Sequence, residues 1–391
     1  MVNKFLLMTS SSIISSFSLT KVLKGATLAL VFSSLMLPVL QMRYHLVQTE
    51  PVTENRIKSQ MPTSPWSVLS PHSTYASSFE KYFNDNFGFR DLLIRLKNQF
   101  DYSLFGFSAQ VHIGPNKWLF YKGTYEDTVL ALERRRPEMP KLFNRMRRLR
   151  DLLAARGISL VVISCPMKTT MYQEELPQLD VRPPEFSAFD EYRQFLRNEP
   201  GIITIDAETI LRGLKSTMQV YHRTDFHWND PAGAHTLLAL LTEMEKRAGL
   251  PMSPKPQIKI RIEPETGGGE INSLAALWPP REDMLMLESP LYQSPGTLVD
   301  GGKPNTWTYT APPPPDPTLL PPTVLFGDSF ADAFLRAGFT GRFSELRKFY
   351  NLRFKDDFQL IPANTKFLVL EHIESNLGAM VLDSYWPEEL Q

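Results

Sequence analysis

Two short stretches of the chain carry side chains that could act together as a serine nucleophile and its base. In TDFHW, Asp225 and His227 stand two residues apart. In GDS, Ser329 follows a hydrophobic run and precedes residues that favour a helix. A serine hydroxyl needs a base to take its proton, and the base needs an acid to orient it. We therefore predict Ser329 as nucleophile, His227 as base and Asp225 as orienting acid.

The local backbone expected around these residues supports this interpretation. Residues i and i+2 of an extended segment point to the same side, so the Asp225 carboxylate can reach the His227 ring. The carboxyl ends of parallel strands form the usual substrate edge of an α/β sheet, and both stretches are expected there. The backbone N–H of Ser329 is then a candidate oxyanion donor. Gly268 and Asn272 are candidates for a second donor.

Two other interpretations fit parts of the pattern. A serine before a helix is often only a helix cap. The second alternative is a metal site, although zinc generally requires three or four ligands. We expect Asp230 to cap the helix that begins at Pro231, and we expect neither a metal nor a cofactor. The candidate metal ligands are Asp225, His227 and Asp230, with His222 or His235 added.

The remaining pattern predicts an α/β fold. Continuous apolar runs of this length are typical of parallel strands buried on both faces, and helical periodicity between them predicts crossover helices. A β-hairpin is expected over 111–123, and an irregular, proline-rich insertion over about 250–322. The expected buried strands are 158–164, 201–206, 323–326 and 366–373, and the main helices are 140–156, 188–198 and 231–248.

Composition narrows the class of protein. Lys+Arg and Asp+Glu are equal, at 42 each, so no overall basic charge favours nucleic acid as a partner. The single cysteine, Cys165, excludes an intrachain disulfide, and its place after an apolar run predicts a buried, inert thiol.

The N-terminal region has the pattern of a membrane anchor. Residues 25–42 carry no charge, Lys4, Lys21 and Lys24 precede them, and Arg43 follows. Such a run is about long enough to cross a bilayer, and no small-residue cleavage site follows it. The basic flank predicts a cytoplasmic N-terminus and an extracytoplasmic remainder. We expect an anchor over 1–45, a linker over 46–78 and one domain over 79–391.

The start of that domain has helical periodicity. Phe79, Phe83 and Phe87 recur every four residues, and Leu92, Leu96 and Phe100 do the same. The spacing predicts two helices broken at Gly88, with the aromatic stripe packed inside the protein.

The motifs in this order resemble the alginate O-acetyltransferase family of the AlgJ/AlgX type. The matching pieces are FEKYFNDNFGFRD, IGPNKWLFY, CPMKTTMYQEELP, VYHRTDFHWNDPAG, VLFGDSF and LEHIESNL. The resemblance implies an SGNH-hydrolase-like three-layer sandwich, with Asp225, His227 and Ser329 at the family's catalytic positions. An uncleaved N-terminal anchor is also similar to the AlgJ type.

The resemblance also implies an activity and partners. It indicates a periplasmic O-acetyltransferase that acetylates hydroxyls of an exopolysaccharide, supplied with acetyl by a multi-pass membrane O-acyltransferase. Two alternatives remain open: an acetylesterase with the same three residues, and a non-catalytic subunit of a polysaccharide assembly complex. The proline-rich insertion has no clear counterpart in the family.

Overall fold

The structure is a computed structural model. It describes residues 19–48, 51–52, 57–63, 74–179, 182, 184–252, 254–266, 269–278, 282–314 and 316–391. Contacts divide the chain into two compact units, Met1–Lys97 and Asn98–Gln391. The predicted division at residue 79 stays a prediction.

The first unit contains α1 (Leu19–Tyr44), α2 (Tyr75–Asn86) and the beginning of α3 (Arg90–Phe105). The predicted break at Gly88 is confirmed, because it lies between α2 and α3. Within the described part of the chain, one helical segment is long and apolar enough to cross a membrane. This segment is Lys21–Tyr44, with a mean hydropathy of 1.8.

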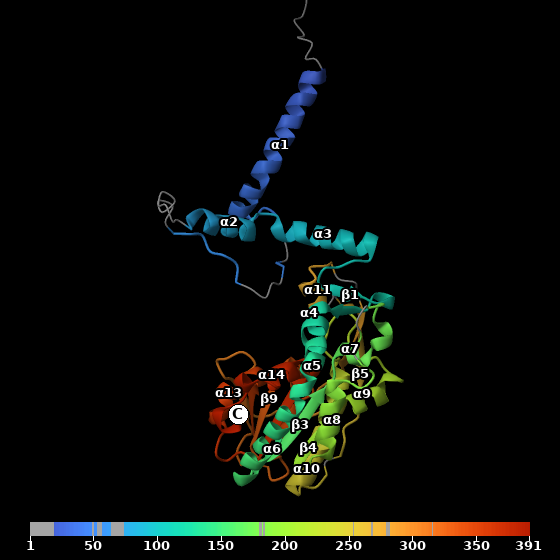
Figure 1. Cartoon of the computed structure of the whole chain (residues 1–391), viewed down its shortest axis with the longest axis vertical. Coiled ribbons are helices and arrows are strands. Elements are labelled where there is room, and N and C mark those ends of the chain that lie inside the picture. Colours follow the sequence, from blue (N-terminus) through green and yellow to red (C-terminus); the bar gives the residue numbers. More distant parts are fainter. Residues whose placement is uncertain are drawn as a thin grey trace, which may run out of the picture. The chain divides into compact units, whose positions relative to one another are not determined.

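The second unit is built on a seven-stranded sheet (Figure 1). Its first five strands are parallel, and the last two are antiparallel to their neighbours. The predicted α/β class with a mostly parallel sheet is therefore confirmed. In spatial order the strands are β4 (Ile202–Asp206), β3 (Ser159–Cys165), β11 (Phe367–Ile373), β9 (Thr323–Gly327), β10 (Glu345–Tyr350), β8 (Trp307–Thr310) and β7 (Thr297–Asp300).

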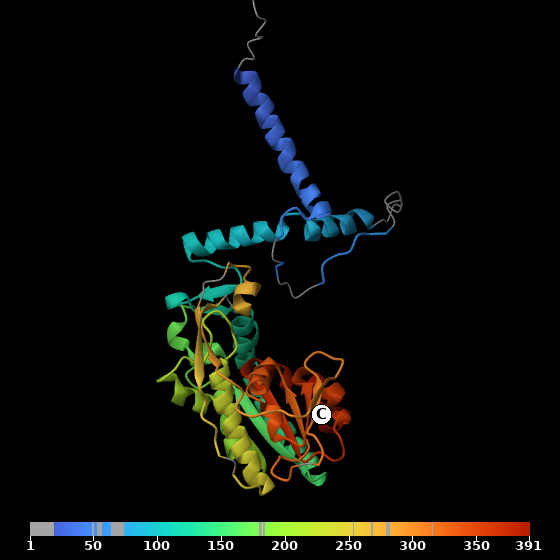
Figure 2. The same ribbon diagram turned by 180° about the vertical axis from the view of Figure 1, so that it is seen from behind.

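Alternate residues of each strand point to opposite sides of the sheet, so both faces of the sheet carry apolar side chains. Helices cover both faces. Val161, Leu325 and Val369 pack into one core with α9 (Ala207–Lys215) and α10 (Asp230–Ala248). Val162, Phe326 and Leu370 pack into the other core with α6 (Met139–Ala155) and α8 (Ala188–Asn198). Figures 1 and 2 show the resulting three layers from opposite sides.

Shorter elements complete the unit. The predicted hairpin is present as β1 (Val111–Ile113) paired with β2 (Leu119–Tyr121). The short helices are α4 (Lys122–Thr124), α5 (Leu130–Arg134), α7 (Lys168–Met171), α11 (Glu270–Leu274), α12 (Asp332–Arg336), α13 (Phe354–Asp357) and α14 (Leu377–Met380).

The segment 250–322 is more regular than expected. It contains the antiparallel pair β5 (Ile260–Thr266) and β6 (Glu282–Leu287), and it also supplies β7 and β8 to the main sheet. Leu320, near the end of this proline-rich insertion, is fully buried and forms a β-bridge with Phe343. The sequence reading missed these strands because proline density masks the short alternating runs between the prolines.

Candidate active site

The nucleophile candidate lies in a turn that buried polar groups hold in place. Ser329 follows β9 and begins a short 3-10 helix, Ser329–Ala331. The Asp328 carboxylate accepts hydrogen bonds from Phe330 N at 2.9 Å and from Asn351 Nδ2 at 3.1 Å. Asp328 N donates to Glu371 Oε2 at 2.9 Å. Asp328 is therefore the residue that caps this turn, which leaves the Ser329 hydroxyl available for another contact.

Gly327 lies directly against the side chain of Glu371 on β11. A Cβ at this position would come 2.9 Å from Glu371 Oε2, closer than side-chain carbons normally approach an oxygen. Glu371 is fully buried, and burial, with the nearby Asp328 charge, raises its pKa well above the usual value. The Cys165 thiol donates to Glu371 Oε1 at 3.4 Å. Burial also raises the pKa of Cys165 well above its usual value, which agrees with the predicted inert thiol.

The three residues singled out in the sequence meet at the carboxyl edge of the sheet. His227 Nδ1 lies 2.7 Å from Asp225 Oδ1, and His227 Nε2 lies 2.7 Å from Ser329 Oγ. Asp225 Oδ1 also accepts the backbone N–H of His227 at 3.0 Å. The side chains of His227 and Asp225 are 20% and 17% exposed, so solvent reaches the group from one side. The expected hydrogen-bond geometry is thus present.

Aromatic rings fix the plane of the imidazole. Phe226 stacks on the His227 ring with centroids 4.1 Å apart, and Phe330 approaches it at 5.2 Å. Trp228 is fully buried and donates from Nε1 to Phe330 O at 3.0 Å. This last bond joins the loop that carries His227 directly to the turn that carries Ser329.

A buried lysine holds the other side of the His227 loop. Lys168, in the CPMK motif after β3, donates from Nζ to three backbone carbonyls. An ammonium has three donors and no acceptor, so this arrangement satisfies it completely. Burial lowers the pKa of Lys168 to about 7, whereas the Asp225 and Glu282 carboxylates raise it. The acceptors are His222 O at 3.1 Å, Arg223 O at 3.0 Å and Asp225 O at 2.6 Å.

Two further residues of the site escaped the sequence analysis. The Glu282 carboxylate accepts from Arg223 N at 2.7 Å and from Thr224 N at 3.1 Å, immediately before Asp225. A Cβ on Gly269 would lie 2.7 Å from Asp225 Oδ2, so only glycine fits there. Both residues come from the segment predicted to be an irregular insertion. The run of three glycines at 267–269 was the one sequence feature there that could have indicated a close backbone approach.

Three of the residues proposed as metal ligands, Asp225, His227 and Asp230, have other partners. The sequence pointed to Asp230 as the helix cap, and this is wrong. Asn229 caps α10 by accepting from Ala232 N at 3.0 Å, because its extended backbone places its side chain over the first turn. Asp230 instead pairs with Arg336 Nε at 2.7 Å. Within the described residues, no group of three potential ligands is close enough to hold a metal ion.

The two candidates for a second oxyanion donor are not decided by the structure. Gly268 lies outside the described residues. Asn272 belongs to α11, and its side chain also lies outside the described residues.

Comparison with known proteins supports the class expected from the motifs. Residues 111–293 match the family model described as an SGNH hydrolase-like domain, acetyltransferase AlgX. This segment includes Asp225 and His227 and ends before Ser329. The similarity to an SGNH hydrolase-like domain therefore extends over that segment, and the predicted three-layer arrangement is present as a central sheet with a core on each face.

Two curated relatives are named probable alginate O-acetylase AlgJ. The protein from Azotobacter vinelandii is 27% identical over 212 residues, and that from Pseudomonas syringae pv. tomato is 29% identical over 217 residues. Each match covers 54% of this chain and 53% of the relative, so the chain spans about half the length of these relatives. The resemblance to the AlgJ/AlgX type is thereby confirmed.

A solved structure with a similar fold is the O-acetyltransferase domain of Pseudomonas putida AlgJ. It has a TM-score of 0.49 and 18% sequence identity, and the match covers 71% of this chain and 96% of that domain.

Removing the Lys168 ammonium should lower turnover more than stability. In Lys168→Met, three carbonyls of the His227 loop lose their common donor, so the loop should shift by a fraction of an ångström to an ångström. A displacement of about 1 Å at a reacting group can cost about 10²-fold in rate. We expect kcat for a chromogenic acetyl ester to fall by about that factor, with little change in KM.

Lys215→Met is the matched control for this measurement. Lys215 also donates to a backbone carbonyl, that of Met171, and lies over the Tyr172 ring, but it does not contact the His227 loop. Its kcat should stay near that of the parent protein. An unchanged kcat in Lys168→Met, or an equal loss in the control, would show that Lys168 does not position the loop.

A buried carboxyl beside the CPMK segment should make stability depend on pH. Burial raises the pKa of Glu374 to about 7, while hydrogen bonds from Thr170 and Met167 oppose that rise. Below pH about 4.5 the group is protonated in both the folded and the unfolded chain. Between about 4.5 and 7 the unfolded chain releases the proton first, so stability falls as pH rises, by at most about 3 kcal/mol.

Glu374→Gln should remove this contribution. The glutamine oxygen can accept the same two hydrogen bonds without a buried charge. We expect a higher free energy of unfolding than the parent above pH 7, with the difference disappearing toward pH about 4.5, as measured by chemical denaturation. Glu288→Gln, at an exposed position, should keep the parent's pH dependence. A pH-independent difference between Glu374→Gln and the parent would contradict the assignment.

Proposed function

We propose that this protein is an O-acetyltransferase that moves acetyl groups onto hydroxyls of an exopolysaccharide through Ser329, His227 and Asp225. The observation that carries the proposal is the position of the His227 ring. Its Nδ1 lies 2.7 Å from Asp225 Oδ1, and its Nε2 lies 2.7 Å from Ser329 Oγ. The similarity to proteins named alginate O-acetylases supports the transfer chemistry and a polysaccharide acceptor.

The reaction proceeds as a double displacement. Asp225 accepts a hydrogen bond from His227 Nδ1, which leaves Nε2 free to take the proton of the Ser329 hydroxyl. Ser329 Oγ attacks the acetyl carbonyl of the donor, and the donor's leaving group departs with the proton held by His227. The product of this half-reaction is an acetyl-serine. The backbone N–H of Ser329 is the proposed donor to the oxyanion.

The second half-reaction reverses the roles. A sugar hydroxyl gives its proton to His227 Nε2 and attacks the acetyl carbonyl, and Ser329 Oγ leaves with the proton returned by His227. Water in place of the sugar would make the same site an acetylesterase. Product analysis with an oligosaccharide acceptor separates these two outcomes, and detection of acetyl on Ser329 separates both from a non-catalytic binding subunit.

We further propose that α1 anchors the protein in the membrane as a single pass, with the second unit on the periplasmic side. A multi-pass membrane O-acyltransferase then supplies the acetyl group from the cytoplasm. The apolar segment Lys21–Tyr44 and the lysines at its N-terminal end support this topology.

Variants of the three site residues should lose activity as a unit. Ser329→Ala and His227→Ala should each abolish nearly all release of acetyl from a chromogenic ester, and the double variant should be hardly worse. In a comparable serine site each such loss is about 10⁶ in turnover, and loss of the aspartate is milder. Asp225→Ala should therefore retain more activity than the other two.

Ser294→Ala is a control for this series, since Ser294 bonds Thr340 and has no contact with His227. Stability should change little in the three single variants of the site and in their double variant, because the site side chains are partly exposed. Partial losses that add in the double variant would point to substrate binding instead. Activity abolished by a chelator would favour the metal alternative.

The topology is tested with reporter fusions. Alkaline phosphatase joined after Gln60 should be active, because that residue follows α1 and is expected outside the cytoplasm. The same reporter joined after Thr20, before the apolar run, should be inactive. An inactive fusion at Gln60, or a mature chain whose N-terminus lies beyond Arg43, would contradict the proposed anchor.

A further inference from the structure

Helices α2 and α3 carry a row of exposed apolar side chains. The sequence predicted that this stripe packs inside the protein, and the structure instead leaves four of its six residues exposed, namely Phe79, Phe83, Leu96 and Phe100. Phe83 is 36% exposed and Leu96 is 48% exposed. Within the first unit the exposed apolar positions, spaced by three or four residues along each helix, are Phe79 and Phe83 on α2 and Leu93 and Leu96 on α3.

One charged residue of each helix is turned inward. Asp85 and Arg95 are only 7% and 6% exposed. Asp85 Oδ2 accepts from Ser59 N at 2.8 Å, and Arg95 Nη2 donates to Pro51 O at 3.1 Å. Both partners belong to described parts of the segment between α1 and α2, which therefore contacts each helix at these positions.

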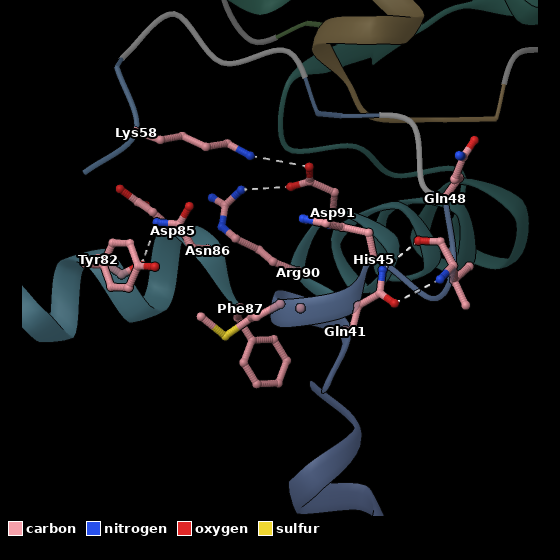
Figure 3. A pocket seen from close by; sticks show the side chains of 13 residues that line it. Gln41, His45, Gln48, Lys58, Tyr82, Asp85, Asn86, Phe87, Arg90 and Asp91 are labelled. Atoms are coloured by element: carbon pink, nitrogen blue, oxygen red, sulfur yellow. Dashed lines mark hydrogen bonds and ion pairs between the residues drawn. The ribbon is translucent and has the colours of Figure 1, made fainter. Parts of the chain in front are cut away.

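A cavity of about 620 Å³ lies where α1, α2 and α3 meet, and charged side chains of α2 and α3 line it (Figure 3). Asp91 pairs there with Lys58 at 3.4 Å and with Arg90 at 3.2 Å. Figure 3 shows the Phe87 ring pointing away from these ion pairs, toward the side on which the α1 ribbon leaves the view. The ring centre of Phe83 lies 5.7 Å from that of Phe87 and 6.4 Å from that of Phe79, so the three rings form a continuous aromatic face.

This apolar face adjoins the end of α1. A Cβ on Gly88 would lie 2.1 Å from Pro38 O, so the break between α2 and α3 sits directly against the last turns of α1. Arg43 and Tyr44 end that helix, and the Arg43 guanidinium lies 5.6 Å from the Tyr44 ring centre. Aromatic and basic residues at the end of an apolar helix are typical of the membrane–water interface.

We infer that the apolar face of α2 and α3 lies in the lipid headgroup region of the membrane that α1 crosses. The inference rests on the proposed anchoring by α1. A helix of this kind buries its apolar side about 5–10 Å deep at the boundary of headgroups and acyl chains. Phospholipid is the occupant that fits, because the face is continuous with the lipid-exposed surface of α1 and large apolar patches are seldom left in water.

Depth measurements on the full-length protein in phosphatidylethanolamine–phosphatidylglycerol vesicles test the inference. An environment-sensitive fluorophore is attached to one new cysteine in each variant, Phe83→Cys or Leu96→Cys on the apolar face. Lys81→Cys, also exposed but on the opposite side of α2, is the matched control. The native Cys165 is fully buried, so the parent protein reports any background labelling.

The labels at positions 83 and 96 should emit at shorter wavelength than the label at 81, and doxyl groups on the lipid chains should quench them several-fold more. Equal emission and weak quenching at all three positions would overturn the inference. Labels at 83 and 96 that are shielded from water but not quenched by doxyl lipids would also overturn it, in favour of a protein partner.

The same samples separate this inference from the proposed function. Flotation of the vesicles reports anchoring by α1, and failure to float would reject both the anchor and the lipid contact of α2 and α3. Acetyl transfer is not part of the measurement, so the depth result holds whether or not Ser329 forms an acetyl-enzyme. Circular dichroism of each labelled variant shows that the fold is retained.

Discussion

The hydrogen bond between His227 and Ser329 is the contact that the surrounding structure has to position. Its two partners lie 102 residues apart in the chain, and neither can be moved independently without breaking it. The parallel sheet places the two residues together, because Ser329 follows β9 at the same edge of the sheet at which the loop before α10 carries His227. The buried hydrogen bond from Trp228 to Phe330 connects this loop to the serine turn, so the alignment depends on packed side chains rather than on the loop alone.

Behind this contact the protein maintains a buried polar layer that a simple core would not need. Lys348 donates to Asp328 O and to Asp332, and Asn376 Nδ2 reaches Asp328 Oδ2 at 2.9 Å. Burying such groups is unfavourable unless each is hydrogen-bonded, and in return a satisfied network selects one backbone geometry. Burial raises the pKa of Asp328 and of Glu371, so these two carboxyls hold their protons more tightly than exposed carboxyls do. The rigidity of the serine turn is thus obtained at a cost in stability.

Local patterns in the sequence were sufficient for the frame of the molecule and for the contacts among Asp225, His227 and Ser329. Continuous apolar runs identified β3, β9 and β11, and the i, i+2 spacing of Asp225 and His227 indicated their contact. Lys168 could not be identified, because its role depends on carbonyls more than fifty positions away. Glu282 and Gly269 were missed for the same reason. The direction of the Phe79 stripe was also misjudged, since periodicity identifies an apolar face but not whether protein, lipid or water lies against it.

The segment between α10 and β9 has a consequence for how such a protein can diverge. It contributes four strands, and Glu282 and Gly269 hydrogen-bond to the loop that carries Asp225. Phe226 of that loop also packs against the cluster that contains Ile271, Ala275 and Leu277. The strand β7 at the edge of the sheet is exposed along its whole length. Its length and surface can therefore differ without disturbing the alignment of the reacting atoms, whereas the part of the segment that packs on the loop cannot.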